Sequence, residues 1–533
     1  MIEFDPVLVH EWLSRSATRT PDKVALVCGD RRWTYRQLDD CSSLLARHLL
    51  ERGLRRHDRV AILLDNSAET VIAIYGTLKA GAAFVNLSSS IKGRKLAYIL
   101  KNSGASCLIT HVAKAQVARD ALERIEQPLR MIWVGDQERL PSASNGVSTS
   151  WDDIFDVEED AMRAALSSLV LPRVIDVDLA TLIYTSGSTG EPKGVMTTHQ
   201  NMVSAARSII QYIDNRRDDV ILNVLPLSFD YGLYQVIMAF MFGATVVLEQ
   251  SFLYLHAILQ RIGEEKVTGF PIVPTIAAML LRLRTIETYD LNSLRYVTNT
   301  GAALPVEHIR QLRKLLPHVT LISMFGLTEC KRVSFLPPHR LDDKPSSVGM
   351  AMPNCEVFVV DEQGEPVPPG QPGELVVRGA NVMQGYWDDP ELTTRTYRPG
   401  RYPAERRLYS GDLFRCDEEG HLYFLGRRDD MIKTKGERVS AREVENCLHA
   451  MDQVSEIAVL GVPDEIFGQA IKACVVPIQG SELTKQEVLR YAAENLESFM
   501  VPKYVVILDE LPRSGNGKID RRKLQTVEEE AAC

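Results

Sequence analysis

This sequence lacks the features of several large protein classes. Its most apolar stretch, Val236 to Leu248, is 13 residues long and is interrupted by Gly243 and Thr245, whereas a membrane-spanning helix needs about 20 apolar residues. We expect a buried helix-to-strand passage there. The start, MIEFDPVLVHEW, carries acidic residues where a signal peptide needs a cationic segment and then an apolar core. We therefore expect a soluble, cytoplasmic protein.

Paired cysteines and long basic runs are also missing. The nine cysteines are scattered and form no C-x-x-C pair, so neither a disulfide framework nor a zinc site is expected. Lys and Arg number 61 against 70 Asp and Glu, and the largest basic cluster spans only Arg52 to Arg59. A protein that binds a phosphate backbone needs the opposite charge balance. We expect no nucleic-acid partner and no membrane partner.

The residues that are present indicate an α/β protein of several domains. A chain of 533 residues with 45% hydrophobic and 25% charged residues is typical of two to four folded domains. β-rich runs alternate with helical patterns over 59–136 and again over 179–325, which predicts βαβ units and mainly parallel sheets. The Ser/Pro/Asn-rich stretch 140–150 between them is expected to be an exposed loop.

The pattern changes after residue 350. Two β-rich runs flank the Gly/Pro cluster of EVFVVDEQGEPVPPGQPGELVVRG, which predicts a hairpin, and we expect a small antiparallel β-barrel or sheet layer over about 350–425. From about Gly426 a short α+β pattern follows. We therefore predict an N-terminal body, 1–428, of two βαβ-type sheets plus this barrel, and a small mobile α+β domain, 429–533.

The most informative segment is TLIYTSGSTGEPKGV, from Thr181 to Val195. An apolar strand runs into six residues that bear a hydroxyl group or are glycine, and Lys193 follows with a positive charge. Glycines let the backbone approach a polyanion, while hydroxyl and N–H groups donate to phosphate oxygens. No GK[ST] follows at the spacing of a Walker loop. Taken alone, the segment fits a phosphate loop or a flexible polar loop.

Eight motifs in order resemble the adenylate-forming superfamily of acyl-CoA synthetases, nonribosomal-peptide adenylation domains and firefly-type luciferases. They span most of the chain: WTYRQLD (33–39), LKAGAAFVNL (78–87), YTSGSTGEPKGV (184–195), MFGLTE (324–329), GELVVRGANVMQGYW (373–387), YSGDL (409–413), GRRDDMIKTKGERVS (426–440) and PRSGNGKIDRRKL (512–524). The resemblance implies an AMP-forming ligase that joins a carboxylic acid to ATP with Mg²⁺, releases pyrophosphate and passes the acyl group to a thiol.

By this resemblance, Lys518, Thr328 and Glu329 are the catalytic residues, and Glu329 also holds Mg²⁺. Asp429 is the hinge, and Lys435 and Gly436 form the thiol-transfer loop. Phe325 would stack on adenine, and Asp412 with Arg427 would hold the ribose. The full set of implied ATP-binding residues is Thr185, Ser186, Gly187, Ser188, Thr189, Gly190, Lys193, Gly301, Ala302, Phe325, Gly326, Asp412 and Arg427.

The implied acyl pocket consists of Asp230, Tyr231, Tyr234, Pro271, Thr298, Thr300, Met324, Arg332 and Val333. Asp230 stands where amino-acid-activating members pair an aspartate with the substrate's ammonium, and a charge in a pocket needs a partner. That partner is either a substrate amine or Arg332. The amine points to a small amino acid such as L-proline, transferred to the phosphopantetheine of a separate carrier protein. An Asp230–Arg332 pair points to an amine-free acid and coenzyme A.

Other interpretations receive less support. A luciferase-type oxidoreductase shares the same motifs, and light emission would reveal it. A non-catalytic nucleotide-binding protein would be expected to have lost Lys518, Glu329 or the phosphate loop, all of which are present. His199, just beyond that loop, is either a structural histidine or a helix-start residue, and we leave it out of the catalytic set.

Overall fold

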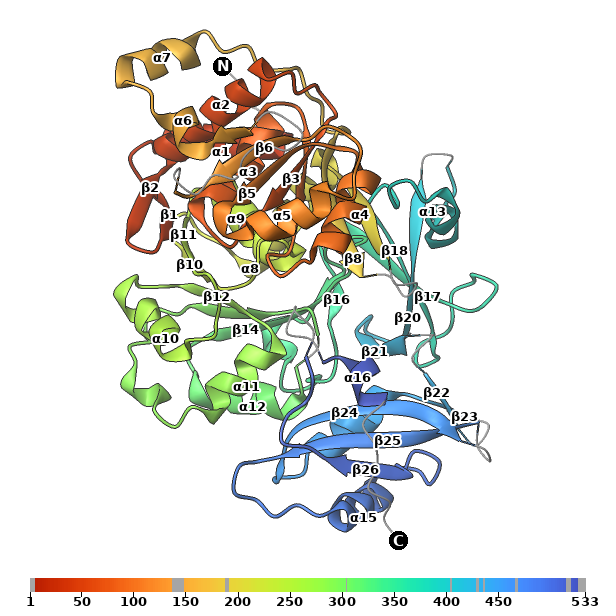
Figure 1. Cartoon of the computed structure of the whole chain (residues 1–533). Helices are drawn as coiled ribbons and strands as arrows, with labels where there is room; N and C mark the ends of the chain where they lie inside the picture. Colours follow the sequence, from red (N-terminus) through yellow and green to blue (C-terminus); the bar gives the residue numbers. More distant parts are fainter. Residues whose placement is uncertain are drawn as a thin grey trace.

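The structure, a computed structural model, describes residues 5–136, 148–186, 191–302, 304–402, 405–427, 431–434, 437–464, 468–513 and 519–525. Within these ranges the chain forms two large, mainly parallel sheets, a smaller antiparallel sheet and a C-terminal α+β part (Figure 1). This is the α/β architecture that the strand and helix alternation predicts.

The first large sheet has seven strands, all parallel except for the final β8–β9 pair. In spatial order they are β7 (Ser148–Ser150), β6 (Arg130–Val134), β5 (Ala105–His111), β3 (Arg59–Leu63), β4 (Ala83–Asn86), β8 (Leu179–Ser186) and β9 (Pro192–Thr198). The expectation of a loop over 140–150 was wrong at its end, because 148–150 pair with β6. Residues 137–147 lie outside the described ranges.

The second large sheet has nine strands and includes two from the N-terminus. In spatial order they are β16 (Met350–Ala351), β15 (Ser334–Phe335), β14 (Thr320–Phe325), β13 (Tyr296–Asn299), β12 (Gly269–Ile272), β10 (Val220–Asn223), β11 (Thr245–Leu248), β1 (Val24–Cys28) and β2 (Arg31–Thr34). The six strands from β14 to β1 are parallel, and the pairs at the two edges are antiparallel.

Helices cover both sheets and create two apolar layers. On β3, Val60 and Ile62 face a core shared with the nine-stranded sheet, whereas Ala61 and Leu63 face a second core under α4 and α5. A strand buried on both faces needs such a continuous apolar run. The helices of the body are α1 (Val9–Arg19), α2 (Tyr35–Glu51), α3 (Ala68–Lys79), α4 (Gly93–Ser103), α5 (Ala115–Leu122), α6 (Trp151–Phe155), α7 (Glu159–Ser167), α8 (His199–Ile213), α9 (Asp230–Phe242), α10 (Leu255–Glu264), α11 (Pro274–Arg282), α12 (Val306–Leu315) and α13 (Pro390–Thr396).

The apolar run near residue 240 forms the predicted helix-to-strand passage. Helix α9 ends at Phe242, Gly243 adopts φ +81°, and β11 begins at Thr245.

The β-rich region after residue 350 is an antiparallel sheet, and β17 and β18 form the predicted hairpin. Its strands are β17 (Cys355–Val360), β18 (Gly373–Gly379), β20 (Arg406–Cys416) and β19 (Tyr397–Pro399), with β21 (Leu422–Arg427) paired to β20. These described strands form the expected antiparallel sheet layer, in which β17 lies at one end of the strand order and β19 at the other.

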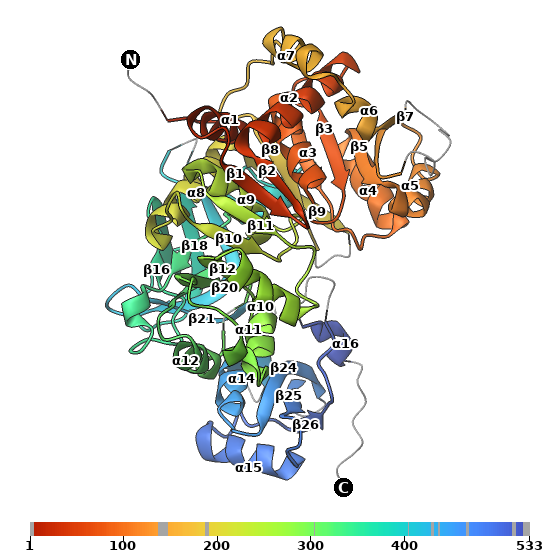
Figure 2. The same ribbon diagram turned by 90° about the vertical axis from the view of Figure 1, so that its left-hand side faces the viewer.

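The C-terminal part is a small α+β unit below the body in Figures 1 and 2. It comprises β22 (Ile432–Thr434), β23 (Glu437–Val439), α14 (Ala441–His449), β24 (Val454–Asp464), β25 (Gly468–Pro477), α15 (Lys485–Asn495), β26 (Tyr504–Ile507) and α16 (Arg521–Gln525). The α+β pattern expected from about Gly426 is therefore present in the described residues.

The seam between the C-terminal part and the body contains polar contacts. Arg282 of α11 pairs with Glu456 of β24 at 3.1 Å, and Arg513 donates to the Thr275 hydroxyl at 2.8 Å. His308 of α12 packs edge-on against His449 of α14. Each hydrophobic cluster among the described residues lies entirely within one of the two parts.

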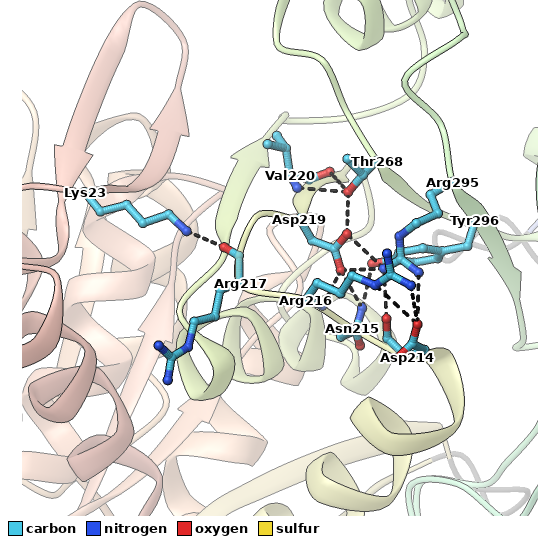
Figure 3. A network of polar contacts seen from close by, with 10 residues as sticks. All are labelled: Lys23, Asp214, Asn215, Arg216, Arg217, Asp219, Val220, Thr268, Arg295 and Tyr296. Atoms are coloured by element: carbon cyan, nitrogen blue, oxygen red, sulfur yellow. Dashed lines mark hydrogen bonds and ion pairs between the residues drawn. The ribbon is translucent and has the colours of Figure 1, made fainter.

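A polar network joins the amino ends of three parallel strands in the nine-stranded sheet (Figure 3). Buried Asp219, just before β10, accepts from Arg295, just before β13, at 2.8 and 2.9 Å. It also accepts from the Thr268 hydroxyl, just before β12, at 2.8 Å. The network aligns these strands at their amino ends. The loops at their carboxyl ends therefore lie together at the opposite end of the strands, where ligands bind in open α/β sheets.

Candidate active site

The predicted phosphate loop connects an antiparallel strand pair. Thr185 on β8 lies opposite Lys193 on β9, so their side chains share one face of the pair. Ser186 lies opposite Pro192 at the end of the ladder. The loop residues Gly187, Ser188, Thr189 and Gly190 lie outside the described residues.

Glu329 lies in the turn after β14, and three groups orient it. The Tyr386 hydroxyl donates to Glu329 Oε1 at 2.8 Å. The Glu329 carbonyl accepts from the Met383 N–H at 3.0 Å and from the Tyr397 hydroxyl at 3.4 Å. Burial, and then the neighbouring Glu329 carboxylate, raise the pKa of Tyr386, so its phenol stays a donor. Tyr386 lies in the motif GELVVRGANVMQGYW (373–387), but the sequence alone assigned no role to this residue.

Tyr386 also connects Glu329 to the phosphate loop. It forms a β-bridge with Val195 of β9, and the flanking Trp387 N–H donates to the Gly194 carbonyl at 2.7 Å. Thr328 precedes Glu329 in the same turn. The structure therefore brings the turn with Thr328 and Glu329 together with the strand that carries Lys193.

The residues expected to hold adenine and ribose lie around one aromatic cluster. Phe325, at the end of β14, packs edge-on against Phe414 of β20, with ring centroids 5.1 Å apart. On the same strand, the buried Asp412 faces Arg427 of β21, whose Nε lies 3.4 Å from Asp412 Oδ1. A carboxylate in this position can accept from hydroxyl groups. Gly301, with φ +87°, and Ala302 lie exposed in the turn after β13.

The expected acyl-pocket residues meet at the carboxyl ends of the parallel strands. Pro271 of β12 pairs in register with Thr298 of β13, and the Tyr231 hydroxyl lies 2.9 Å from the Thr298 carbonyl and 2.8 Å from its Oγ1. Tyr234 lies one turn further along α9 and is fully buried. Thr300, Met324 and Val333 are also buried beside these strands.

Asp230 begins α9, and the cation that meets it is Lys331. The Lys331 ammonium lies 3.5 Å from Asp230 Oδ2 and donates to the Asp230 carbonyl at 2.8 Å. It also lies 4.2 Å from the centre of the Tyr234 ring, a cation–π distance. The Asp230–Arg332 pair, one of the two alternatives that the sequence left open, is not formed: among the described residues, Arg332 makes no ion pair with Asp230.

Two glycines allow this pairing. A β-carbon at Gly326 would lie 2.4 Å from the Lys331 carbonyl oxygen, so only glycine lets the turn after β14 fold back on itself. A β-carbon at Gly232 would lie 2.4 Å from the Pro226 carbonyl oxygen, so glycine lets the first turn of α9 pack against the loop after β10. Lys331 itself has φ +62°, a left-handed conformation that turns its side chain toward α9.

Burial lowers the pKa of Lys331 to about 7, although the Asp230 carboxylate opposes this shift. Between this value and the ordinary lysine pKa, the unfolded chain binds more protons than the folded one, so stability rises with pH. We expect the melting temperature of the wild type, minus that of Lys331→Met, to increase from pH 7 to pH 9. Thermal unfolding of both proteins in matched buffers measures this difference. A difference that stays constant between pH 7 and pH 9 would contradict the lowered pKa of Lys331.

His199 is a structural residue at the start of α8. Its Nδ1 accepts from the Val9 N–H at 3.1 Å, and burial lowers its pKa to about 4, so the ring is neutral near pH 7. Four further residues with a predicted role, Lys518, Asp429, Lys435 and Gly436, lie outside the described residues. Among the helices of the described ranges, none has the length and apolar composition that crossing a bilayer requires.

Two family models match the chain. That of the AMP-binding enzyme matches residues 13–387, and that of the AMP-binding enzyme C-terminal domain matches residues 443–518. The long-chain-fatty-acid–CoA ligase of Bacillus subtilis (strain 168) is 32% identical, over 97% of this chain and 94% of that protein.

This chain is also similar to parts of proteins that are much longer than itself, and to a solved structure. Bacitracin synthase 1 of Bacillus licheniformis is 31% identical over 97% of this chain. The chain spans only 9% of that protein, and 6% and 10% of two linear gramicidin synthase proteins of Brevibacillus parabrevis. The crystal structure of the anthranilate CoA ligase AuaEII in complex with anthranoyl-AMP superimposes with a TM-score of 0.86 at 26% identity, over 98% of this chain and 97% of that one.

Proposed function

Because this chain belongs to the AMP-binding enzyme family, we propose that its substrate is a small carboxylic acid without an α-amino group. The family comprises AMP-forming ligases that activate acyl or amino acids as adenylates. We further propose that the activated acyl group passes to the thiol of coenzyme A.

The Asp230–Lys331 pair carries this proposal. A carboxylate at the wall of an acyl pocket needs a positive partner, and Asp230 already has one in the protein, at 3.5 Å. A substrate ammonium would have to share Asp230 with the Lys331 ammonium, and like charges repel. The acyl-CoA ligase from Bacillus subtilis, which matches this chain over 94% of its own length, supports the choice of acceptor.

The roles that we propose for the nucleotide site follow the described geometry. Lys193 and Thr185 would contact the β- and γ-phosphates, Thr328 the α-phosphate, Phe325 the adenine, and Asp412 the ribose hydroxyls. Charge neutralisation by fixed cations and donors is the main catalytic requirement of such phosphoryl chemistry.

Glu329 fits the requirements of a magnesium ligand. Mg²⁺ is commonly held by one or two carboxylates together with substrate phosphates, and Tyr386 holds the Glu329 carboxylate in one orientation at 2.8 Å. When bound, the ion would neutralise phosphate charge. The contribution of this chain is to present that carboxylate beside the strand that carries Lys193.

For Lys518, the hinge and the thiol-transfer loop we retain the roles that the resemblance implies. The Lys518 ammonium would contact the carboxylate and α-phosphate oxygens during adenylation. Rotation of residues 429–533 about Asp429 would then withdraw it and bring Lys435 and Gly436 toward the thiol. We propose 1–428 and 429–533 as the two domains.

Activation of an amino acid such as L-proline, with transfer to a separate carrier protein, is the second candidate. One observation favours it: Asp230 begins α9 with 23% of its side chain exposed, so it has room for a second cation. The similarity to bacitracin synthase 1 is compatible with this function.

Substrate-dependent ATP–pyrophosphate exchange tests both candidates. We expect a signal with one or more small amine-free acids and none above background with L-proline or other amino acids. Product analysis with coenzyme A should then give an acyl-CoA thioester. Exchange with amino acids alone would contradict the proposal and support the second candidate.

Asp230→Asn separates the two roles of this aspartate. If Asp230 only balances Lys331, the variant should retain exchange with an amine-free acid within about threefold, because the buried lysine can lose its proton. If Asp230 anchors a substrate ammonium, the same variant should lose about 100-fold with an amino acid, the usual cost of removing one partner of a buried charge pair.

A further inference from the structure

The acyl-pocket region contains a second buried cation, Arg332. Its side chain is 2% exposed, and its guanidinium lies over the Tyr231 ring at 5.4 Å and beside Tyr212 of α8. Among the described residues it makes no ion pair with a carboxylate, and its Nε has no hydrogen-bond partner. Asp230, the carboxylate that the sequence offered as a possible partner for Arg332, is paired with Lys331.

Among the described residues, the groups packed around Arg332 do not supply the missing negative charge. Burial raises the pKa of Tyr212 to about 12 and also raises the pKa values of Tyr231 and Tyr234, so these three phenols are neutral near pH 7. Lys331 adds a positive charge. Because Asp230 is already paired with Lys331, it leaves the charge of Arg332 unbalanced.

A buried guanidinium without a carboxylate is costly to a protein. Arginine keeps its proton under all ordinary conditions, so it cannot become neutral as a buried lysine can. Burial of an unpaired charge costs several kcal/mol, and a planar guanidinium is suited to bind a carboxylate through two parallel hydrogen bonds. A ligand anion would offset this cost.

We propose that Arg332 binds a second acidic group of the substrate, so that the preferred substrate is a small dicarboxylic acid or an acid with an equivalent second anion. One carboxylate of this substrate is adenylated, and the other pairs with Arg332 on the Tyr231 side of the pocket. This inference rests on the proposed function, since it requires that the residues around Tyr231 line the acyl site.

Matched acid pairs test this inference: malonate against propionate, succinate against butyrate, and glutarate against valerate. In ATP–pyrophosphate exchange, we expect kcat/KM for at least one diacid to exceed that for its monoacid partner by about tenfold or more. A hydrogen-bonded charge is worth a factor of about 10 to 100. A preference for the monoacid in all three pairs would overturn the inference.

Arg332→Met keeps the length of the side chain and removes its charge. It should lower kcat/KM for the diacid about 10- to 100-fold while changing that for the monoacid by about twofold or less, and Arg332→Lys should restore part of the difference. Equal losses for the two acids would make Arg332 a structural residue and overturn the inference. If Arg332→Met fails to fold, the wild-type pairs and Arg332→Lys still decide.

Arg310→Met is the matched control. Arg310 lies on α12 with 69% of its side chain exposed, and its replacement should leave both acids unaffected. If no amine-free acid of any kind supports exchange in the wild type, the proposed function itself fails. If monoacids alone support exchange, the proposed function stands and only the role of Arg332 is refuted.

Discussion

Replacement of Glu329 by Gln is expected to reduce ATP–pyrophosphate exchange about 100- to 1000-fold, the usual cost of removing one group that stabilises transition-state charge. Glutamine has nearly the same shape, and the Tyr386 hydroxyl can still donate to its carbonyl oxygen, so the turn should remain folded. The variant loses the negative charge of the Glu329 carboxylate, which we propose as a magnesium ligand. Steady-state exchange over a range of Mg²⁺ concentrations measures the effect, and near wild-type activity would refute the assignment.

Two controls separate charge from position. Tyr386→Phe removes the 2.8 Å hydrogen bond to Glu329 Oε1 and keeps the charge, so it should cost about tenfold, as is usual for groups that orient a metal ligand. More Mg²⁺ should recover part of this loss. Glu356→Gln removes a carboxylate that is 53% exposed and pairs with Arg378 in the antiparallel sheet, and it should leave exchange unchanged.

Replacement of Lys331 by Met is expected to destabilise the protein by about 3 kcal/mol, at the low end for a broken buried ion pair. The low end applies because the Asp230 side chain keeps 23% exposure and can recover some hydration. Urea unfolding at pH 7 measures the change in the apparent midpoint. The double variant Asp230→Asn, Lys331→Met should recover most of the loss, because it leaves no unpaired charge at this point.

An exposed ion pair provides the comparison for this second experiment. Lys266 and Asp290 lie 2.9 Å apart with 69% and 49% side-chain exposure, and such pairs contribute about 0 to 1 kcal/mol. Lys266→Met should therefore change the midpoint little. If Lys331→Met and Lys266→Met cost the same, or if the double variant is no more stable than Lys331→Met, the Asp230–Lys331 pair does not carry the stability that we assign to it.

The alternation of strands and helices could be predicted from the sequence because buried parallel strands leave a clear apolar signal. Val60 to Leu63 are apolar at every position since both faces of β3 are covered. The addition of β1 and β2 to the nine-stranded sheet could not be predicted. Val27 pairs with Val247, and no local pattern encodes a contact so distant along the chain.

The candidate site was predicted in part, and the partner of Asp230 shows where sequence reasoning fails. Lys331 and Arg332 are neighbouring cations of similar length, so the sequence offers both. The choice depends on the φ of +62° at Lys331 and on the close approach that Gly326 permits, both of which are properties of the folded turn. The roles of Lys518, Asp429 and the loop 187–190 remain predictions.

The polar seam between the body and the C-terminal part bears on the domain rotation that we propose. Each hydrophobic cluster of the described residues lies on one side of the seam, and the Arg282–Glu456 pair that crosses it is 54% and 18% exposed. Dissolved ions screen such pairs, and opening them exposes no shared apolar core. If residues 429–533 rotate as we propose, the ionic strength of the medium becomes a determinant of that rotation, and moderate salt should favour it.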